Sequence, residues 1–188
     1  MMKKLFLVVL SAALGVCALS AYSANGKHRI PPVANVDLPR FMGDWYVIAN
    51  IPTIAERKSY DAVETYALRK DGRIQTTFRQ RKGGFDAPID TMRPVGTVRA
   101  GSNNAIWGMQ FIWPIKAEYV IVHLDEAYTQ TIIGRSARDY AWIMARTPQI
   151  SEADYAAHVE RLRVLGYDTS KLRRVPQRSL ADRPNSAP

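Results

Sequence analysis

The feature that most constrains the fold of this chain is a series of about eight short β-prone segments, separated mainly by turn residues. The segments cover residues 45–50, 63–68, 74–80, 94–99, 106–113, 119–124, 129–134 and 140–145. Asp71-Gly72 is the strongest hairpin signal between them. No helical pattern separates the segments, which excludes a β-α-β architecture. The regular spacing predicts an antiparallel sandwich or an up-and-down barrel.

One helix is expected after the last of these segments. Pro148 ends the strand, and Ser151 is a good N-cap residue with Asp154 three positions further on. Apolar residues then recur at helical spacing over 155–162. Gly166 suits the position just after the end of a helix. Because the opposite face is charged, we expect this helix to lie on the outside of the sheet.

The composition divides the chain into four parts. Residues 1–24 are expected to be an export signal, because Lys3 and Lys4 precede an apolar run of about a dozen residues that is too short to span a bilayer. Residues 25–40 form a lead-in segment whose prolines prevent a long helix, and residues 41–176 hold the strands and the helix. Residues 177–188 are rich in Pro, Arg and Ser, which predicts a disordered tail.

Cys17 is the only cysteine of the chain. Its setting, Leu14-Gly15-Val16-Cys17, resembles a bacterial lipoprotein lipobox, although Val16 stands where that pattern has Gly, Ala or Ser. Acylation of Cys17 would attach the mature protein to a membrane. If the signal is cut further on, the mature chain has no cysteine and its stability depends on burial alone.

The formal net charge is +9, but the basic residues are scattered. No Lys/Arg block with interleaved aromatic residues is present, so the sequence does not indicate nucleic-acid binding. A basic surface beside anionic lipid is the favoured interpretation, with membrane association as a candidate. The histidines at 28, 123 and 158 fall in a linker, a strand and a helix, which predicts no metal site. No catalytic motif is present, and we expect neither an enzyme nor a cofactor.

Three motifs resemble the signatures of the lipocalin family, in order and at the right spacing. The first is Gly43-x-Trp45 at the start of the first strand. The second is the turn 125–128, Asp-Glu-Ala-Tyr, which is similar to the family's Thr-Asp-Tyr turn, although Leu124 stands in place of Thr and the Tyr lies further along. The third is Arg146 at the end of the last strand. The resemblance covers residues of about 36–176. The stretches 113–119 and 139–148 look like the branch that holds the bacterial outer-membrane lipocalins and apolipoprotein D.

The resemblance implies an all-β fold, an eight-stranded antiparallel up-and-down lipocalin barrel with one C-terminal α-helix packed outside. It also implies that the Arg146 guanidinium packs on the Trp45 indole at the closed end, where Gly43 completes the structural signature. The expected location is the bacterial periplasm, with attachment to the outer membrane if Cys17 is lipidated.

Strand parity predicts which side chains line such a barrel, because residues two apart share one face. If Arg146 points inward, so do the residues at 144, 142 and 140. The ligand-binding candidates on all strands are Glu64, Tyr66, Thr76, Phe78, Trp107, Met109, Phe111, Tyr119, Tyr140, Trp142 and Met144. The same alternation adds Ile74, Trp113, Ile121 and His123.

Aromatic walls with a few polar points are the profile of a small-molecule pocket. A buried ten-carbon chain would contribute about 8 kcal/mol before the costs of association. We therefore expect a hydrophobic ligand, a fatty acid or a lysophospholipid, and the resemblance implies a role in envelope maintenance. The resemblance also leaves haem-breakdown pigments, retinoids and sterols open as ligands. Two alternatives stay open: a lipocalin-fold enzyme acting on a small hydrophobic substrate, and a filled barrel used for protein-protein interaction. The oligomeric state is left open.

Overall fold

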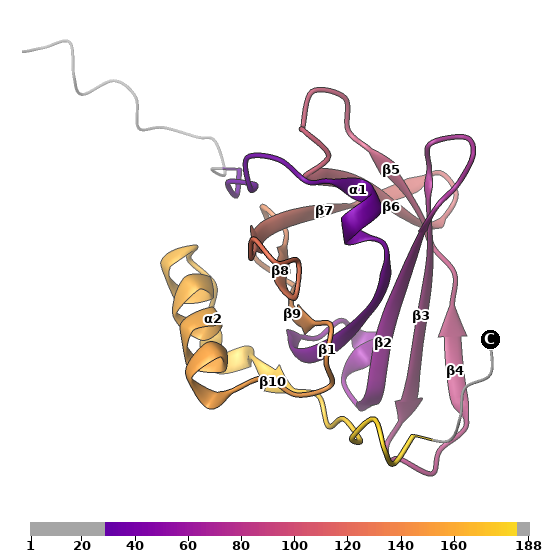
Figure 1. The fold of residues 1–188 in the computed structure, drawn as a ribbon, viewed down its shortest axis with the longest axis vertical. Coiled ribbons are helices and arrows are strands. Elements are labelled where there is room, and N and C mark those ends of the chain that lie inside the picture. Colours follow the sequence, from indigo (N-terminus) through magenta and orange to yellow (C-terminus); the bar gives the residue numbers. More distant parts are fainter. Residues whose placement is uncertain (1–28, 184–188) are drawn as a thin grey trace, which may run out of the picture.

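The computed structural model describes residues 29–183 of the chain. The predicted export signal and Cys17 lie outside this range. Antiparallel strands curve round a common interior (Figure 1) and close where the last barrel strand pairs with the first. The strands are β1 (Gly43–Ile51), β2 (Ser59–Leu68), β3 (Ile74–Lys82), β4 (Ile89–Met92), β5 (Val95–Val98), β6 (Ile106–Ile112), β7 (Ile115–Leu124), β8 (Gln130–Gly134) and β9 (Ala141–Ala145).

Two of these strands are the two halves of one barrel strand. Both β4 and β5 pair with β3, where Met92 lies opposite Phe78 and Gly96 lies opposite Ile74. Pro94 lies between the halves and has no backbone N–H to give to the ladder. The barrel is therefore eight-stranded, antiparallel and closed, which confirms the predicted fold class. The half at 89–92 was not among the predicted segments.

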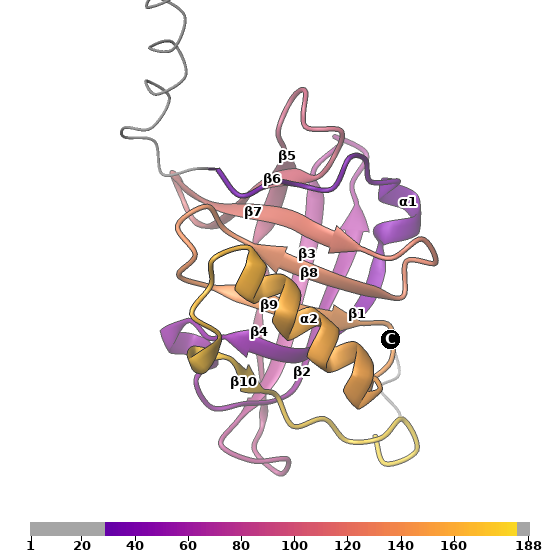
Figure 2. The same cartoon turned by 90° about the vertical axis from the view of Figure 1, so that its left-hand side faces the viewer.

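The helical elements lie around the barrel and at its ends. They are α1 (Leu38–Phe41), the 3-10 turn η1 (Ile54–Glu56), α2 (Glu152–Val164) and the 3-10 turn η2 (Thr169–Lys171). The helix α2 begins after the predicted cap, since Ser151 Oγ accepts a hydrogen bond from the amide of Asp154 at 3.0 Å. Figure 2 shows α2 outside the barrel, across β8 and β9. Within residues 29–183, no helix is long and apolar enough to cross a membrane.

The apolar residues form two separate cores, one inside the barrel and one between its wall and α2. Trp142 and Met144 of β9 belong to the inner core, while Ala141, Ile143 and Ala145 pack toward α2. This division confirms the predicted parity of the last barrel strand. Leu162 is the fully buried contact that α2 contributes to the outer core. The inner core determines how much space is left for a ligand.

The C-terminal segment corrects the prediction of a tail that is disordered from residue 177. After the short strand β10 (Arg173–Arg174), which pairs with β1, the chain runs along the barrel (Figure 1). Gln177 donates hydrogen bonds to the carbonyls of Val47 and Ala62 at 2.8 and 2.9 Å. The guanidinium of Arg178 lies 2.6 Å from the buried carboxylate of Asp61. These contacts tie residues 177–183 to β1 and β2, and composition alone gave no sign of them.

Candidate functional site

One end of the barrel is sealed around the indole of Trp45. The side chain is fully buried, and its Nε1–H donates to the carbonyl of Phe41 at 2.8 Å. The guanidinium carbon of Arg146 lies 3.9 Å from the centre of the indole ring. Burial with a hydrogen bond and a cation–π contact is a stable arrangement for a tryptophan. The predicted pairing of Arg146 with Trp45 is therefore present.

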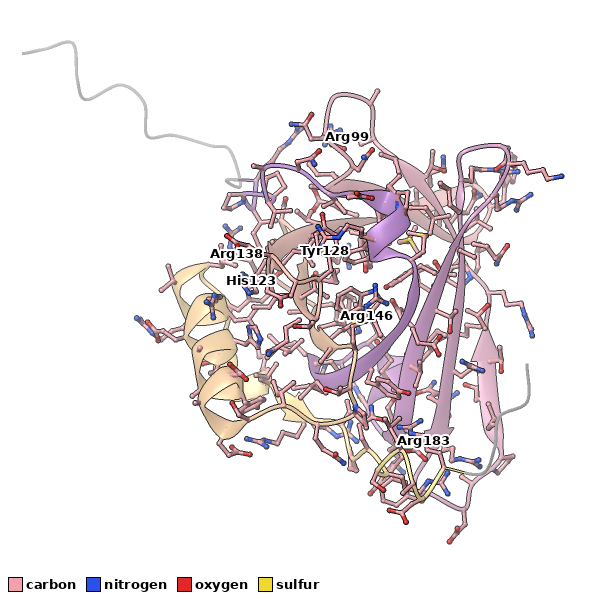
Figure 3. All side chains as sticks on the ribbon, in the orientation of Figure 1. Arg99, His123, Tyr128, Arg138, Arg146 and Arg183 are labelled. Carbon is pink, nitrogen blue, oxygen red and sulfur yellow. The ribbon has the colours of Figure 1, made fainter. Side chains whose placement is uncertain are left out.

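The hydrogen bonds of Arg146 close this end further. Nη1 donates to the carbonyl of Asp44 at 2.8 Å, and Nη2 donates to the carbonyls of Arg40 and Phe41 at 2.8 and 3.1 Å. Gly43 has a φ of +92°, and a Cβ there would lie 3.4 Å from Nη1 of Arg146. Glycine therefore suits both the backbone and the close approach. Figure 3 shows Arg146 beside α1, which carries Arg40 and Phe41.

A layer of packed aromatic rings lies above this seal. The ring of Phe41 is 5.7 Å from that of Tyr66 and 5.5 Å from that of Trp107. Trp107 is stacked on Tyr119, with 4.8 Å between ring centres. The layer fills the barrel at this height and forms the floor of the remaining space.

This layer corrects three of the predicted ligand-binding residues. Tyr66, Thr76 and Trp107 face inward as parity predicts, but they are fully buried in or beside the packed layer and do not line the cavity. Parity gives the face of a side chain and not its height along the barrel axis. Ile74 and Ile121 are likewise fully buried in the inner core.

The barrel keeps a cavity of about 300 Å³ above the aromatic floor. Of the predicted residues, its lining includes Glu64, Phe78, Met109, Phe111, Tyr119, Tyr140, Trp142 and Met144. The remaining lining residues were not predicted: Thr53, Ala55, Glu56, Met92, Ala117, Glu118, Ile133 and Arg135. Ile133 could have been found from the parity of β8. Residues 53–56 belong to the loop and turn η1, for which strand alternation gives no signal.

Three acidic residues, Glu56, Glu64 and Glu118, are among the lining residues of this mostly apolar space. Glu118 accepts hydrogen bonds from the amide and the hydroxyl of Ser136 at 2.6 and 3.1 Å. Glu56 is held by three donors, the amide and hydroxyl of Thr53 at 3.2 and 2.6 Å and the indole N–H of Trp142 at 2.7 Å. Glu64 accepts a hydrogen bond from the hydroxyl of Tyr66, which lies 2.6 Å from the hydroxyl of Tyr119. The polar groups at the floor therefore form a short chain from Glu64 to Tyr119.

Burial governs the protonation of this chain. Removal from bulk water, with the negative charge of Glu56 as a smaller cause, raises the pKa of Glu64 to about 8. The part of the Glu64 side chain that stays accessible faces the cavity. Burial and the nearby Glu64 also raise the pKa of Tyr119 well above its ordinary value. At neutral pH the floor therefore presents the protonated carboxyl group of Glu64 and the neutral hydroxyl of Tyr119.

The candidate His123 lies outside the barrel, which corrects its predicted inward orientation. The pairing of β7 with β8 shifts register between Ile121 and His123, so alternation is broken there. The ring of His123 lies 5.3 Å from that of His158 on α2, and Figure 3 shows it on the side of that helix. His158 is hydrogen-bonded to Gln130 at 2.7 Å. In residues 29–183 no group of three or more His, Cys, Asp or Glu side chains is placed to hold a metal ion.

Next to the cavity, the β6–β7 hairpin ends in an exposed apolar tip. We use the term apolar tip for residues 111–115, Phe-Ile-Trp-Pro-Ile. Ile112 is 73% exposed and Trp113 is 83% exposed, so the predicted inward orientation of Trp113 is wrong. Phe111 belongs to the tip and also lines the cavity. The tip is therefore continuous with the wall of the cavity.

Comparisons with known proteins agree with this geometry. The family model of the lipocalin-like domain matches residues 36–177. Temperature-induced lipocalin-1 of Arabidopsis thaliana is 32% identical over 168 residues, which is 86% of this chain and 90% of the relative. The outer membrane lipoprotein Blc of Vibrio cholerae is 26% identical over 180 residues, which is 94% of this chain and 99% of the relative.

More distant matches extend the same pattern. Apolipoprotein D of Bos taurus is 27% identical over 154 residues, covering 78% of this chain and 79% of that protein. The solved structure of insecticyanin from the tobacco hornworm Manduca sexta superposes with a TM-score of 0.63 at 15% identity, covering 81% of this chain and 86% of that one. The predicted resemblance to bacterial outer-membrane lipocalins and apolipoprotein D is confirmed, and this chain belongs to the lipocalin family.

Proposed function

We propose that this protein binds and carries a single-chain lipid, a lysophospholipid or a fatty acid, in the service of bacterial envelope maintenance. The observation that carries the proposal is the cavity of about 300 Å³, which is walled largely by aromatic and aliphatic side chains. This volume lies at the small end of the range for ligand pockets. A filled barrel used only for protein contacts would have no such space.

The size of the cavity limits how the lipid is held. Each buried CH₂ group contributes about 0.8 kcal/mol, so part of an acyl chain is enough for measurable affinity. The rest of the chain and the head group would lie at the mouth. Arg135 lines the cavity and lies close to Tyr140, with its guanidinium 5.3 Å from that ring. A phosphate or carboxylate held at the mouth would share this cation with Asp139, whose carboxylate lies 3.1 Å from the guanidinium.

Membrane association is part of the proposal, and the apolar tip supports it. Three of its large side chains, Ile112, Trp113 and Ile115, are between 71 and 83% exposed. Contiguous exposed apolar surface of this kind is typical of interaction sites. Lys116 follows directly, and the chain carries a formal net charge of +9. We propose that the tip enters the interface of an anionic bilayer, which would bring the cavity mouth to the lipid.

Export and anchoring are proposals as well. Relatives named outer membrane lipoproteins match this chain over most of its length, which supports export to the envelope. We propose that the mature protein lies in the periplasm, and that acylation of Cys17 would attach it to the outer membrane.

Mass spectrometry of the protein purified from a bacterial envelope tests the proposal most directly. The intact mass reports the N-terminus and any acyl groups on Cys17, and an organic extract reports the bound lipid. We expect a lipid that is recovered unchanged, as a carrier requires. Recovery of a converted product would favour the alternative of an enzyme acting on a small hydrophobic substrate. An empty cavity that also fails to bind a labelled fatty acid or lysophospholipid would contradict lipid carriage.

A further inference from the structure

The inner half of the cavity has a chemical character that a simple acyl-chain site does not need. We propose that it is a subsite for an organic cation, so that the cavity prefers a hydrophobic ligand with an ammonium group at its buried end. This inference rests on the proposed function, since it assumes that the cavity takes a hydrophobic ligand. For a ligand with an ammonium group it reverses the orientation given above: the charged group lies at the cavity floor and the hydrocarbon chain extends toward the mouth.

The first observation is an excess of acidic groups. Glu56 and Glu64 both line the cavity, and they are close enough for the charge of one to affect the other. In the described part of the chain, Arg135 is the one basic residue that lines the cavity. Its guanidinium lies 3.1 Å from the carboxylate of Asp139, so its charge already has a partner. Glu118 also lines the cavity, where Ser136 donates to its carboxylate. Within residues 29–183, a ligand cation would therefore find three acidic residues in the lining and one cation, Arg135, that lies in an ion pair.

The second observation is the kind of wall that surrounds these acids. The lining includes five aromatic rings, those of Phe78, Phe111, Tyr119, Tyr140 and Trp142. An ammonium group is attracted to the faces of such rings, and the attraction is stronger where water is excluded. Aromatic rings combined with carboxylates are therefore well suited to alkylammonium ions. An acyl chain alone would be served equally well by aliphatic walls.

The third observation is the arrangement around Glu64. Its polar neighbours are Glu56 on η1, Tyr66 on the same strand and Tyr119 on β7, and none of them is cationic. The residues paired with it on β1 and β3 are Trp45 and Phe78. A ligand carboxylate at this depth would be repelled by the charge of Glu56 and would meet no cation among these neighbours, and a methyl end would form no polar contact with either acid. An ammonium ion would form an ion pair there.

Cation binding at this position is coupled to a proton. Glu64 holds a proton at neutral pH, because burial raises its pKa to about 8. When an ammonium ion binds, the Glu64 O–H bond breaks, the proton passes to water, and the carboxylate pairs with the cation. The ligand cation then offsets the charge that Glu64 gains. Binding should therefore strengthen with rising pH until Glu64 is already ionised in the free protein.

Calorimetric titration with three matched ten-carbon probes tests the inference. The probes are decyltrimethylammonium, which is charged at every pH, decanol and decanoate, each kept below its micelle-forming concentration. We expect decyltrimethylammonium to bind most tightly at pH 8. Its affinity should rise about tenfold per pH unit between pH 6 and 8 and then level off. The pH profile of the parent protein needs no variant, so it cannot be confused with misfolding.

Two variants locate the effect. Glu64→Gln should lose about tenfold or more of the cation affinity at pH 8 and abolish the pH dependence, with decanol binding little changed. Glu160→Gln removes the same charge from the exposed face of α2, where Glu160 pairs with Arg163, and should behave like the parent. Decanoate or decanol binding as tightly as the cation at pH 8, or an unaltered pH profile in Glu64→Gln, would overturn the inference.

A lysophospholipid titration separates this inference from the proposed function. If the lysophospholipid binds and decyltrimethylammonium does not, lipid carriage stands and the cation subsite is wrong. If neither the lysophospholipid nor decyltrimethylammonium binds, both the proposed lipid carriage and the cation subsite are wrong.

Discussion

The two ends of this barrel are built on opposite principles. At the closed end every large group has a partner: Trp45 is buried, hydrogen-bonded to Phe41 and covered by Arg146. Toward the open end the chain leaves a cavity, a buried acid with a raised pKa at Glu64, and exposed rings such as Trp113. The closed end is therefore built for stability. Toward the open end, the unfilled cavity, the buried acid and the exposed apolar rings each lower the stability of the free protein. A bound ligand or a membrane in contact with this end would offset part of that loss.

The largest expected effect tests the closed end. Trp45→Ala removes a fully buried ring, its hydrogen bond and the surface on which Arg146 packs. Substitutions of this kind cost about 3–5 kcal/mol, because a cavity is left behind. We expect urea unfolding to show a loss of unfolding free energy in this range. Trp45→Phe, which keeps an aromatic ring, should lose clearly less, and equal losses in the two variants would show that the indole makes no special contribution.

The next effect tests the buried acid at the cavity floor. Glu64 has a pKa of about 8 in the folded protein against an ordinary value of 4.5, so the folded state binds more protons than the unfolded state between these values. The unfolding free energy should therefore fall as the pH rises from 4.5 to about 8, by at most about 1.4 kcal/mol per pH unit. Below pH 4.5 the loss is absent, and above pH 8 it is constant.

Glu64→Gln should remove this dependence, and the stability difference between variant and parent should grow from pH 5 to pH 8 in urea titrations. His158, the buried histidine of α2, acts in the opposite direction. Burial is the main cause that lowers the pKa of His158 from 6.5 to about 4, so the unfolded state binds more protons between these values and stability is lost as the pH falls from about 6.5 to about 4. Both proteins carry His158, so its effect cancels in the difference. A constant difference across the range would mean that Glu64 does not hold a buried proton.

The comparison of the two ends also explains which features were predictable from sequence. The Trp45–Arg146 pair was predicted because both residues belong to short motifs whose partners are fixed by the closure of β1 on β9. The inward row of β9 was predicted because that strand alternates without a break over Trp142 and Met144. Such local patterns predict the structure correctly where no bulge or turn interrupts the strand.

The wrong predictions concern positions at which strand alternation does not determine where the side chain lies. Tyr66 and Trp107 face inward, but Phe41 from α1 packs against both and fills the barrel at their height. His123 is turned outward by the register shift in β7. Glu56 reaches the cavity from η1, which has no strand parity at all. The depth of a cavity depends on such long-range packing, which a single strand does not encode.

A smaller effect separates stability from binding at the open end. Trp142 lines the cavity and is only partly buried, and its indole N–H donates to Glu56 at 2.7 Å. We expect Trp142→Ala to keep the fold and to weaken binding of a labelled fatty acid or lysophospholipid by about tenfold, through loss of aromatic wall. Titration followed by fluorescence of the label measures this. Binding equal to that of the parent would mean that the proposed lining is wrong.

The smallest effect on stability is expected at the apolar tip, where the effect on membranes should be large. Ile112 and Trp113 are 73 and 83% exposed, so replacing both with serine should change the unfolding free energy by no more than about 0.5 kcal/mol. Nevertheless, we expect much less of this variant than of the parent to sediment with vesicles of phosphatidylethanolamine and phosphatidylglycerol. Binding of the parent should weaken with added salt, since part of the attraction is between charges.

Val164→Ser is the matched control for the tip, because Val164 is 71% exposed on α2, outside the barrel wall. It removes exposed apolar surface without touching the tip, so its vesicle binding should equal that of the parent. Loss of binding in this control would indicate a general effect of surface hydrophobicity. If instead the tip variant sediments like the parent, the exposed rings do not contact lipid. The open end would then collect its ligand from solution, and its difference from the closed end would lie in the cavity alone.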